Sequence, residues 1–275
     1  MGRPLARIDP IHLETLAQRL SDEEIAVELG FARVTVTSAR KRLGIPSFTA
    51  STGLKRRDGA CTHGGRRRRL FFNEHFFANL SSEAAAYFLG LIAADGSVGQ
   101  QQDRLEITLA EPDEHLLFSF LECLDARNCR IVARRRQDRS KTFHRLTLCS
   151  KAMAGDLVSW GLTPRKTEAF SLARPIPPDL VRHFVRGFWD GDGSIGSTHF
   201  EVGVRSEPFA RQLRSMIAEV GGERPPLRPT TTRAGKPFFV MAVASKRFEL
   251  FRQELYRDAC FYMARKYKRF EMWWC

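Results

Sequence analysis

The sequence of 275 residues lacks any long apolar run. No stretch reaches the roughly 18 uninterrupted apolar residues that a membrane-spanning helix needs. The first residues, Met1 to Leu5, lead into no apolar signal core, and position six carries no Ser or Thr that would mark a lipidated N-terminus. We therefore expect a soluble protein that stays inside the cell, in the cytoplasm, and has no membrane partner.

Closely spaced cysteines are absent as well. The six cysteines contain no Cys-x-x-Cys pair, the spacing that is typical of structural zinc sites. Cys61 and His63 lie near each other, but two ligands without a second pair do not define a metal site. The pattern also does not match the disulfide framework of a secreted protein, so we expect reduced thiols.

Acidic residues are few relative to basic ones. The chain has 44 Lys and Arg against 31 Asp and Glu, a formal net charge of +13. Such a surplus favours a polyanionic partner, because each phosphate that a protein neutralises releases condensed counterions. The charge is concentrated in residues 40–69, which hold ten basic residues and one acid. We expect double-stranded DNA as the partner, contacted in this segment by Arg66, Arg67, Arg68 and Arg69.

The composition divides the chain into three regions. Residues 1–46 have a compact helical pattern, whereas residues 47–75 are rich in Ser, Thr, Gly and Arg and have little apolar periodicity. From residue 76 onward the chain is apolar and patterned to its end. We predict a small N-terminal helical domain (1–46), a basic linker (47–75) and a large domain with two halves, 76–175 and 176–275.

The N-terminal segment has the spacing of a helix-turn-helix. An N-cap at Ser21 begins a helix that ends at Gly30, and a second helix is predicted from Val34 to Leu43. The alternative is a helical hairpin that only packs on the large domain, but the basic segment directly behind it favours DNA binding. The second helix would contact phosphates and base edges through Thr35, Thr37, Ser38, Arg40 and Lys41.

The large domain contains an internal repeat. Leu89–Ser97 matches Arg186–Ser194, so that Asp192 follows Asp95 by 97 residues. Four further matches occur in the same order at offsets of 95 to 100 residues. Chance does not readily produce such an order, and the chain therefore carries a duplicated unit of about 95 residues.

Each repeated unit is predicted to read helix, strand, strand, helix, strand, strand, helix. In the first unit the helices include Ser82–Ala94 and Asp113–Leu124, and the strands include Arg104–Leu109 and His144–Leu148, whose side chains alternate in character. The second unit begins with a helix capped near Pro178-Asp179. Two such units from one duplication predict a pseudo-two-fold α+β domain.

Small residues recur along the first helix of each unit. Gly90 and Ala94 lie four residues apart in the first, as do Gly187 and Gly191 in the second. Residues at this spacing share one face of a helix, and small ones let two helix backbones approach closely. A glycine inside a helix costs roughly 1 kcal/mol relative to alanine, so we expect these four residues to form a helix–helix interface.

The same two helices end in acids. Asp95 and Asp192 lie at their C-terminal ends, each followed by a glycine suited to a left-handed turn. Two close carboxylates in a partly dry site repel each other and oppose the helix dipole. Mg²⁺ or Mn²⁺ would remove the repulsion and bind substrate phosphates, and a metal ion held there activates water for phosphodiester hydrolysis. We predict a metal site formed by Asp95, Asp192 and the backbone carbonyls of Gly96, Gly193 or their neighbours.

The segments around these acids resemble the LAGLIDADG motif of homing endonucleases, and the resemblance covers roughly residues 76–275. Two motifs in one chain are typical of the monomeric type of this family. The resemblance implies a duplicated αββαββα fold with a β-saddle, and a site-specific endonuclease associated with an intron or mobile element. Such enzymes cut both DNA strands across the minor groove with Mg²⁺ and leave short 3′ overhangs. Asp95 and Asp192 fall on the eighth motif position, which is the metal-binding carboxylate.

The first motif departs from the family pattern at its sixth position. Ala93 stands there in place of an acid, whereas the second motif has Asp190. This position is not a metal ligand in the family, so the departure does not affect the predicted site. The resemblance also implies a basic residue near the scissile phosphates, matched here by Lys166 and Lys266, because the Arg-Lys pairs that contain them recur together. We assign both lysines to the catalytic set with the two motif acids.

The DNA-binding saddle that the resemblance implies has basic candidates in both halves. For any one of them a solvated surface charge is as plausible as a DNA contact, but together they favour DNA. In the first unit the candidates are Arg134, Arg135, Arg136, Arg139, Lys141 and Arg145, and in the second Arg205, Arg228, Arg233 and Lys236.

Three alternatives make different demands on the sequence. A LAGLIDADG-derived protein without catalysis, either a DNA-binding regulator or an intron maturase, usually loses one or both eighth-position acids, whereas this chain keeps both; the helix-turn-helix leaves a regulator open. An intein needs a nucleophilic first residue and a terminal His-Asn, and neither is present. The third alternative is a basic protein whose duplication is purely structural. A single Asp-Gly would indicate only a turn, but a purely structural duplication does not require an acid at the end of both helices. We therefore predict a Mg²⁺-dependent double-strand endonuclease.

Overall fold

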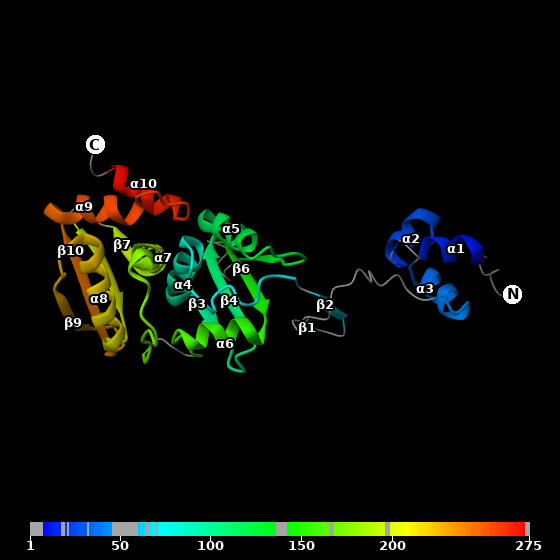
Figure 1. Ribbon diagram of the computed structural model, residues 1–275, viewed down its shortest axis with the longest axis horizontal. Helices are drawn as coiled ribbons and strands as arrows, with labels where there is room; N and C mark the ends of the chain where they lie inside the picture. Colours follow the sequence, from blue (N-terminus) through cyan, green and yellow to red (C-terminus); the bar gives the residue numbers. More distant parts are fainter. Residues whose placement is uncertain are drawn as a thin grey trace. The chain divides into compact units, whose positions relative to one another are not determined.

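The protein forms two compact units, Met1–Asp58 and Gly59–Cys275, which we describe separately (Figure 1). The computed structural model describes residues 8–17, 20, 22–31, 33–45, 60–63, 66–69, 71–135, 142–164, 168–195 and 199–272. Within these residues no helix is both long and apolar enough to cross a membrane.

The N-terminal unit contains three short helices. They are α1 (Pro10–Ala17), α2 (Asp22–Leu29) and α3 (Arg33–Arg42), and the last two lie within a few residues of the helices predicted from the sequence. Gly30 and Gly44 follow them with φ angles of 67° and 68°, the left-handed conformation that ends many helices. The helices enclose an apolar core of their own, which is formed by Leu13, Leu16, Ala17, Ile25, Ala26, Val36, Ala39 and Ile45.

Part of the segment expected to be a linker has regular structure. Strand β1 (Ala60–His63) pairs with β2 (Arg66–Arg69) in an antiparallel arrangement, with Ala60 opposite Arg69. Residues 46–59, which include most of the Ser- and Thr-rich part, lie outside the described residues. The basic run at residues 66–69 therefore belongs to a paired strand and not to an unstructured linker.

The two halves of the large unit repeat the same order of elements, as predicted. The first consists of α4 (Glu83–Asp95), β3 (Gly96–Val98), β4 (Arg104–Ala110), α5 (His115–Cys123), β5 (Ile131–Arg135), β6 (Thr142–Cys149) and α6 (Lys151–Ser159). The second consists of α7 (Val181–Asp192), β7 (Gly193–Ile195), β8 (His199–Val204), α8 (Glu207–Gly221), β9 (Leu227–Thr231), β10 (Pro237–Ala244) and α9 (Ser245–Tyr256). A further helix, α10 (Ala264–Met272), follows.

The two sheets have the same strand order, which confirms the duplicated α+β fold. The order is β3-β4-β6-β5 in the first sheet and β7-β8-β10-β9 in the second, and all neighbours are antiparallel. In β4, Leu105, Ile107 and Leu109 are buried while the residues between them are partly exposed. Because side chains alternate along a strand, each sheet has one face on the core and one face toward solvent.

Three helices of the large unit begin at a serine N-cap. Ser82, Ser150 and Ser206 cap α4, α6 and α8 by accepting a hydrogen bond from the backbone N–H three residues later, which satisfies one of the unpaired donors of the first turn. The cap expected near Pro178-Asp179 is different. A short 3-10 turn, Pro178–Leu180, runs directly into α7, and no side chain caps that helix.

Helices α4 and α7 lie side by side between the two sheets (Figure 1). A Cβ atom on Gly90 would lie 2.8 Å from the backbone N of Phe188 and would overlap the carbonyl oxygen of Phe184. Likewise, a Cβ atom on Gly187 would overlap the carbonyl oxygen of Tyr87. The two backbones are therefore in direct contact, and only glycine fits at both crossing points.

The cysteines do not all match the expectation of reduced thiols. Cys123, Cys129 and Cys260 are free, whereas Cys149 is disulfide-bonded. Burial raises the pKa of the Cys123 and Cys129 thiols, so few of these groups are present as the reactive thiolate near neutral pH.

We predict that Gly187→Ala destabilises the protein, because the added methyl group forces the two helix backbones apart. Overpacking of this kind costs about 1–3 kcal/mol or more. The matched control is Gly155→Ala in α6, where the added Cβ would meet no heavy atom within 4 Å apart from the neighbouring backbone of its own helix. This variant should gain about 0.5–1 kcal/mol from the better helix former. Chemical denaturation measures both; an equal or higher midpoint for Gly187→Ala would refute the close packing.

Candidate active site

The two motif acids lie at the same end of the paired helices. Asp95 is the last residue of α4 and Asp192 the last residue of α7, and both are exposed. A Cβ atom on Gly191 would lie 3.1 Å from Oδ2 of Asp95 and would overlap Cβ of Ala94. The side chain of Asp95 therefore lies against the backbone just before Asp192, so the small-residue contact brings both acids to one place.

The glycines after these acids are extended, so the expected left-handed turn is wrong. Gly96 has φ −92° and ψ 163°, and Gly193 has φ −75° and ψ 149°. The chain passes straight from each helix into a strand. Glycine is required there for space: a Cβ on Gly96 would lie 2.7 Å from Cγ2 of Ile92, and one on Gly193 would overlap the indole ring of Trp189.

Lys266 lies directly behind the end of α7. Its side chain is buried, and its ammonium group donates hydrogen bonds to the carbonyl oxygens of Trp189 at 2.8 Å, Gly193 at 2.6 Å and Gly191 at 3.3 Å. These bonds use all three N–H groups of a lysine. The expected contact of Lys266 with a scissile phosphate is therefore corrected to a contact with the backbone around Asp192.

The same contacts correct part of the expected metal site. The carbonyl of Gly193, proposed as a ligand, faces the Lys266 ammonium at 2.6 Å, where a second cation would be repelled. Burial lowers the pKa of Lys266 to about 8, while the nearby Asp190, Asp95 and Asp192 carboxylates act in the opposite direction. The lysine thus supplies the positive charge that two acids at helix C-termini require.

Asp190, the sixth-position acid of the second motif, is fully buried and forms hydrogen bonds inside the protein. Its carboxylate accepts hydrogen bonds from the Tyr87 hydroxyl at 2.8 Å, the Met263 backbone N–H at 2.8 Å and the Tyr256 hydroxyl at 3.3 Å. Burial raises its pKa, and the hydrogen bond from Tyr87 opposes that rise. Asp190 therefore ties α4, α7 and the segment before α10 together.

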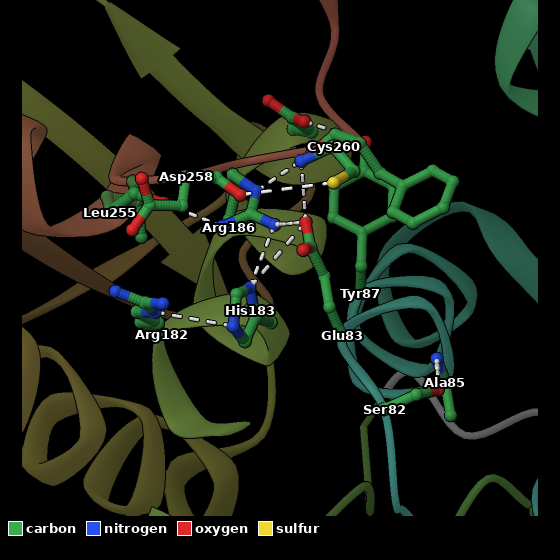
Figure 2. Close-up of polar contacts among 12 residues, drawn as sticks. Ser82, Glu83, Ala85, Tyr87, Arg182, His183, Arg186, Leu255, Asp258 and Cys260 are labelled. Carbon is green, nitrogen blue, oxygen red and sulfur yellow. Dashed lines mark hydrogen bonds and ion pairs between the residues drawn. The ribbon is translucent and has the colours of Figure 1, made fainter. Parts of the chain in front are cut away.

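A second buried polar cluster, missed from the sequence, lies at the other end of the same helix pair (Figure 2). The Arg186 side chain has no exposed surface, and its guanidinium donates to Glu83 Oε1 at 2.6 Å and to the carbonyls of Leu255 and Phe261, each at 2.8 Å. His183 lies beside it, and burial together with the Arg186 charge lowers the pKa of His183 to about 4.

The signal that could have revealed this cluster is the difference between the two repeats. At the offset of 97 residues that relates Asp95 to Asp192, Arg186 corresponds to Leu89, and Glu83 corresponds to Leu180. Both leucines are buried. One side of the helix pair is therefore held by a buried ion pair and the other by apolar contacts, although the backbones repeat.

The outer face of the first sheet carries part of the predicted DNA-binding set. Arg134 is exposed, and strand alternation places it on the same face as Arg145, which lies 3.8 Å from Glu106. Arg135 pairs with Thr142 and so points to the opposite face. The predicted residues Arg136, Arg139 and Lys141 lie outside the described residues.

In the second sheet the predicted set divides into two groups. Arg228 and Arg233 are exposed, and Arg228 is paired with Val240 on the solvent face of β9 and β10. Lys236 donates to Glu168 Oε1 at 2.9 Å, and Arg205 forms an ion pair with the same carboxylate. These two charges hold Glu168, and together they lower the pKa of its carboxyl group.

In the N-terminal unit, two residues that were predicted to contact DNA form hydrogen bonds within the unit. Arg40 is buried and pairs with Asp22 at 2.7 Å, and it also donates to the Ile45 carbonyl at 2.7 Å. The Thr37 hydroxyl donates to the same Asp22 carboxylate at 2.9 Å. The prediction that Arg40 and Thr37 contact DNA is therefore wrong, because both side chains bind inside this unit.

For the remaining predicted residues, DNA contact stays a prediction. Ser38 is exposed on α3 and Thr35 is half-buried. Lys166 lies outside the described residues, as do the side chains of Lys41, Arg66, Arg67, Arg68 and Arg69.

The donor set at the motif acids fits magnesium chemistry. In the described part of the chain, no group of three or more His, Cys, Asp or Glu side chains could hold a metal ion. Asp95 and Asp192 are the two carboxylates at the ends of α4 and α7. Mg²⁺ is often bound by only one or two carboxylates together with substrate phosphates, so a two-carboxylate site is compatible with such an ion when the substrate is a phosphodiester.

The family to which this fold and site belong is shown by comparison. A model described as "LAGLIDADG-like domain" matches residues 82–157 and 179–255, which together make up more than half of the chain. The two matches coincide with the two halves described above. The chain therefore belongs to the LAGLIDADG-like family, in which it carries two repeats.

Solved structures with a similar fold are distant in sequence. The N-terminal LAGLIDADG domain of DUF199/WhiA is 14% identical, with 71% of this chain and 93% of that chain covered and a TM-score of 0.46. The homing endonuclease I-WcaI bound to its DNA recognition sequence is 13% identical, with 64% and 81% covered and a TM-score of 0.43. I-DmoI in complex with DNA and Mn is 15% identical, with 66% and 98% covered and a TM-score of 0.44. No curated protein sequence matches the chain.

We predict that Glu83→Leu destabilises the protein by about 3 kcal/mol, because it leaves the buried Arg186 charge without its partner. The double variant Glu83→Leu/Arg186→Leu copies the residues at the matching positions of the opposite side, Leu180 and Leu89, and should recover much of that loss. Thermal and denaturant unfolding of the two variants give the comparison. A double variant that is no more stable than Glu83→Leu would show that the unpaired Arg186 charge is not the main cause of the lost stability.

Proposed function

We propose that the protein is a site-specific DNA endonuclease that hydrolyses both strands of a duplex with a divalent metal ion. The observation that carries the proposal is the position of the motif acids. Asp95 and Asp192 end two helices whose backbones touch, and Asp95 Oδ2 lies 3.1 Å from where a side chain on Gly191 would begin. Two acids at the junction of two similar halves match the two antiparallel strands of a duplex.

Asp95 and Asp192 would hold the metal ion, which we propose to be Mg²⁺ or Mn²⁺. When bound, such an ion activates a water molecule and stabilises the leaving oxygen of a phosphodiester. The protein's own residues hold both carboxylates exposed at one end of the helix pair. Lys266 secures the backbone on both sides of Asp192 and, from beneath, balances the negative charge of the acids.

The charge of the chain supports DNA as the substrate. The net charge is +13, and neutralised phosphates release counterions. Arg134 and Arg228 are exposed on the solvent faces of the two sheets, where a duplex lying across both halves would meet them. The N-terminal unit, with Ser38 exposed on α3, and the basic strand β2 would add contacts beyond this surface.

A DNA-binding regulator without catalysis is the second candidate. The observation in its favour is that Lys266, expected near the scissile phosphates, donates its hydrogen bonds to the backbone. A protein that only binds DNA can keep such a lysine as a structural element. The retained pair Asp95 and Asp192 favours the enzyme, because two acids facing a phosphate backbone weaken binding unless a metal ion lies between them.

Cleavage of a selected site distinguishes the two candidates. We would select bound duplexes from a random pool in Ca²⁺, insert the site into a plasmid, and add Mg²⁺ or Mn²⁺. The endonuclease is expected to linearise the plasmid. Asp95→Asn and Asp192→Asn should each slow double-strand cutting more than about a hundredfold, since each removes a metal-binding charge, while site binding in Ca²⁺ is retained.

The outcomes of this experiment separate cleavage from binding. A tightly bound site that stays intact in Mg²⁺ and Mn²⁺ would exclude the enzyme and leave the regulator. Normal double-strand cutting by either asparagine variant would show that the two acids do not form one site. The footprint on the same site tests the N-terminal unit, since removal of residues 1–58 should shorten the protected length if that unit contacts DNA.

A further inference from the structure

The backbone around Asp192 is held by one side chain from the far end of the chain. The Lys266 ammonium contacts the carbonyls of Trp189 and Gly191 on α7 and of Gly193 on β7. These carbonyls lie before and after Asp192, so the lysine fixes the change from helix to strand at which the acid sits. Carbonyls at a helix end otherwise lack a partner inside the helix, and Lys266 caps this end.

Lys266 itself is held in place from both halves of the protein. Its backbone N–H donates to the Met263 carbonyl at 2.9 Å, and the Met263 N–H donates to the buried Asp190 carboxylate at 2.8 Å. The next residue toward the N-terminus, Arg265, pairs with Asp113 of the first half at 2.7 Å. The segment that carries Lys266 is therefore docked on α7 and on the first half at the same time.

The first motif has no equivalent of the Asp190 anchor. Ala93 occupies the matching position, and an alanine side chain cannot accept a hydrogen bond from the backbone of a following segment. The surroundings of Asp95 and Asp192 therefore differ, although their helices repeat. The end of α7 has a buried carboxylate that docks a capping lysine, whereas the end of α4 lacks such a carboxylate.

We propose that Lys266 is a positioning residue for Asp192, and that it acts on one half of the active site without contacting DNA. This proposal rests on the proposed endonuclease function. If each acid serves mainly the strand nearest to it, loss of the Lys266 cap should impair cutting of one strand much more than cutting of the other. A lysine that bound a phosphate shared by both acids would instead affect the two strands alike and would weaken DNA binding.

The test is strand-resolved cleavage by Lys266→Met, which keeps the apolar length of the side chain and removes the three donors. With each strand labelled at its end, we expect one strand to be cut about 10- to 100-fold more slowly, the range for loss of a residue that orients a metal ligand. The other strand loses only the positive charge of the lysine and should slow by a clearly smaller factor, so that nicked duplex accumulates. Calorimetric titration of the protein–duplex complex with Ca²⁺ should show weaker metal binding, and affinity for the duplex should be unchanged.

Two control variants on the same helix separate this role from others. Lys268→Met removes an exposed charge and should leave both strand rates unchanged. Arg265→Met breaks the pairing with the buried Asp113, which is one of the contacts that dock this segment, but keeps the three lysine donors. It should therefore lower stability and cause a clearly weaker strand bias than Lys266→Met.

Each result decides the proposal. Equal slowing of both strands, no slowing, or the same bias in Arg265→Met would overturn the positioning role. If the unmodified protein cuts neither strand, the endonuclease fails by itself, and the Ca²⁺ titration still decides whether Lys266 organises the Asp192 site. Unchanged Ca²⁺ binding in Lys266→Met would then reject the proposal.

Discussion

The direct contact between the backbones of α4 and α7 is the constraint on which the rest of the structure depends. Gly90 and Gly187 allow it, because any side chain at either position would overlap a carbonyl oxygen of the opposite helix. The contact brings Asp95 and Asp192 to one end of the pair and leaves a sheet on each side. A wider helix spacing would separate the acids, and the two halves would then no longer form a single site.

The close contact also creates the need for buried polar groups. Two acids at adjacent helix C-termini repel each other and oppose both helix dipoles, and the Lys266 ammonium offsets this from behind the site. The lysine in turn requires a docked segment, which Asp190 and Arg186 hold through backbone groups of residues 255–263. Much of the asymmetry between the halves thus follows from the way one acid pair is supported.

Much of the fold could be predicted from the sequence because its signals are local. The helix Ser82–Ala94 and the alternation along Arg104–Leu109 depend on neighbouring residues, and the internal repeat predicted the second half from the first. The supports of the site could not be predicted in this way. Lys266 reaches carbonyls more than seventy residues away, and Arg186 pairs with Glu83 across 103 residues, so neither partner follows from spacing. The conformation of Gly96 was also missed, because its need for glycine comes from the Ile92 side chain and not from a turn.

The position of the metal ion tests directly whether Asp95 and Asp192 form one metal site. A crystal of the protein bound to its selected duplex, soaked with Mn²⁺ and measured at the manganese absorption edge, shows each metal ion as an anomalous peak. We predict peaks between the carboxylates of Asp95 and Asp192 and the DNA backbone, with none at the Gly193 carbonyl that Lys266 occupies. Manganese bound elsewhere, or a duplex that lies away from the two acids, would contradict it.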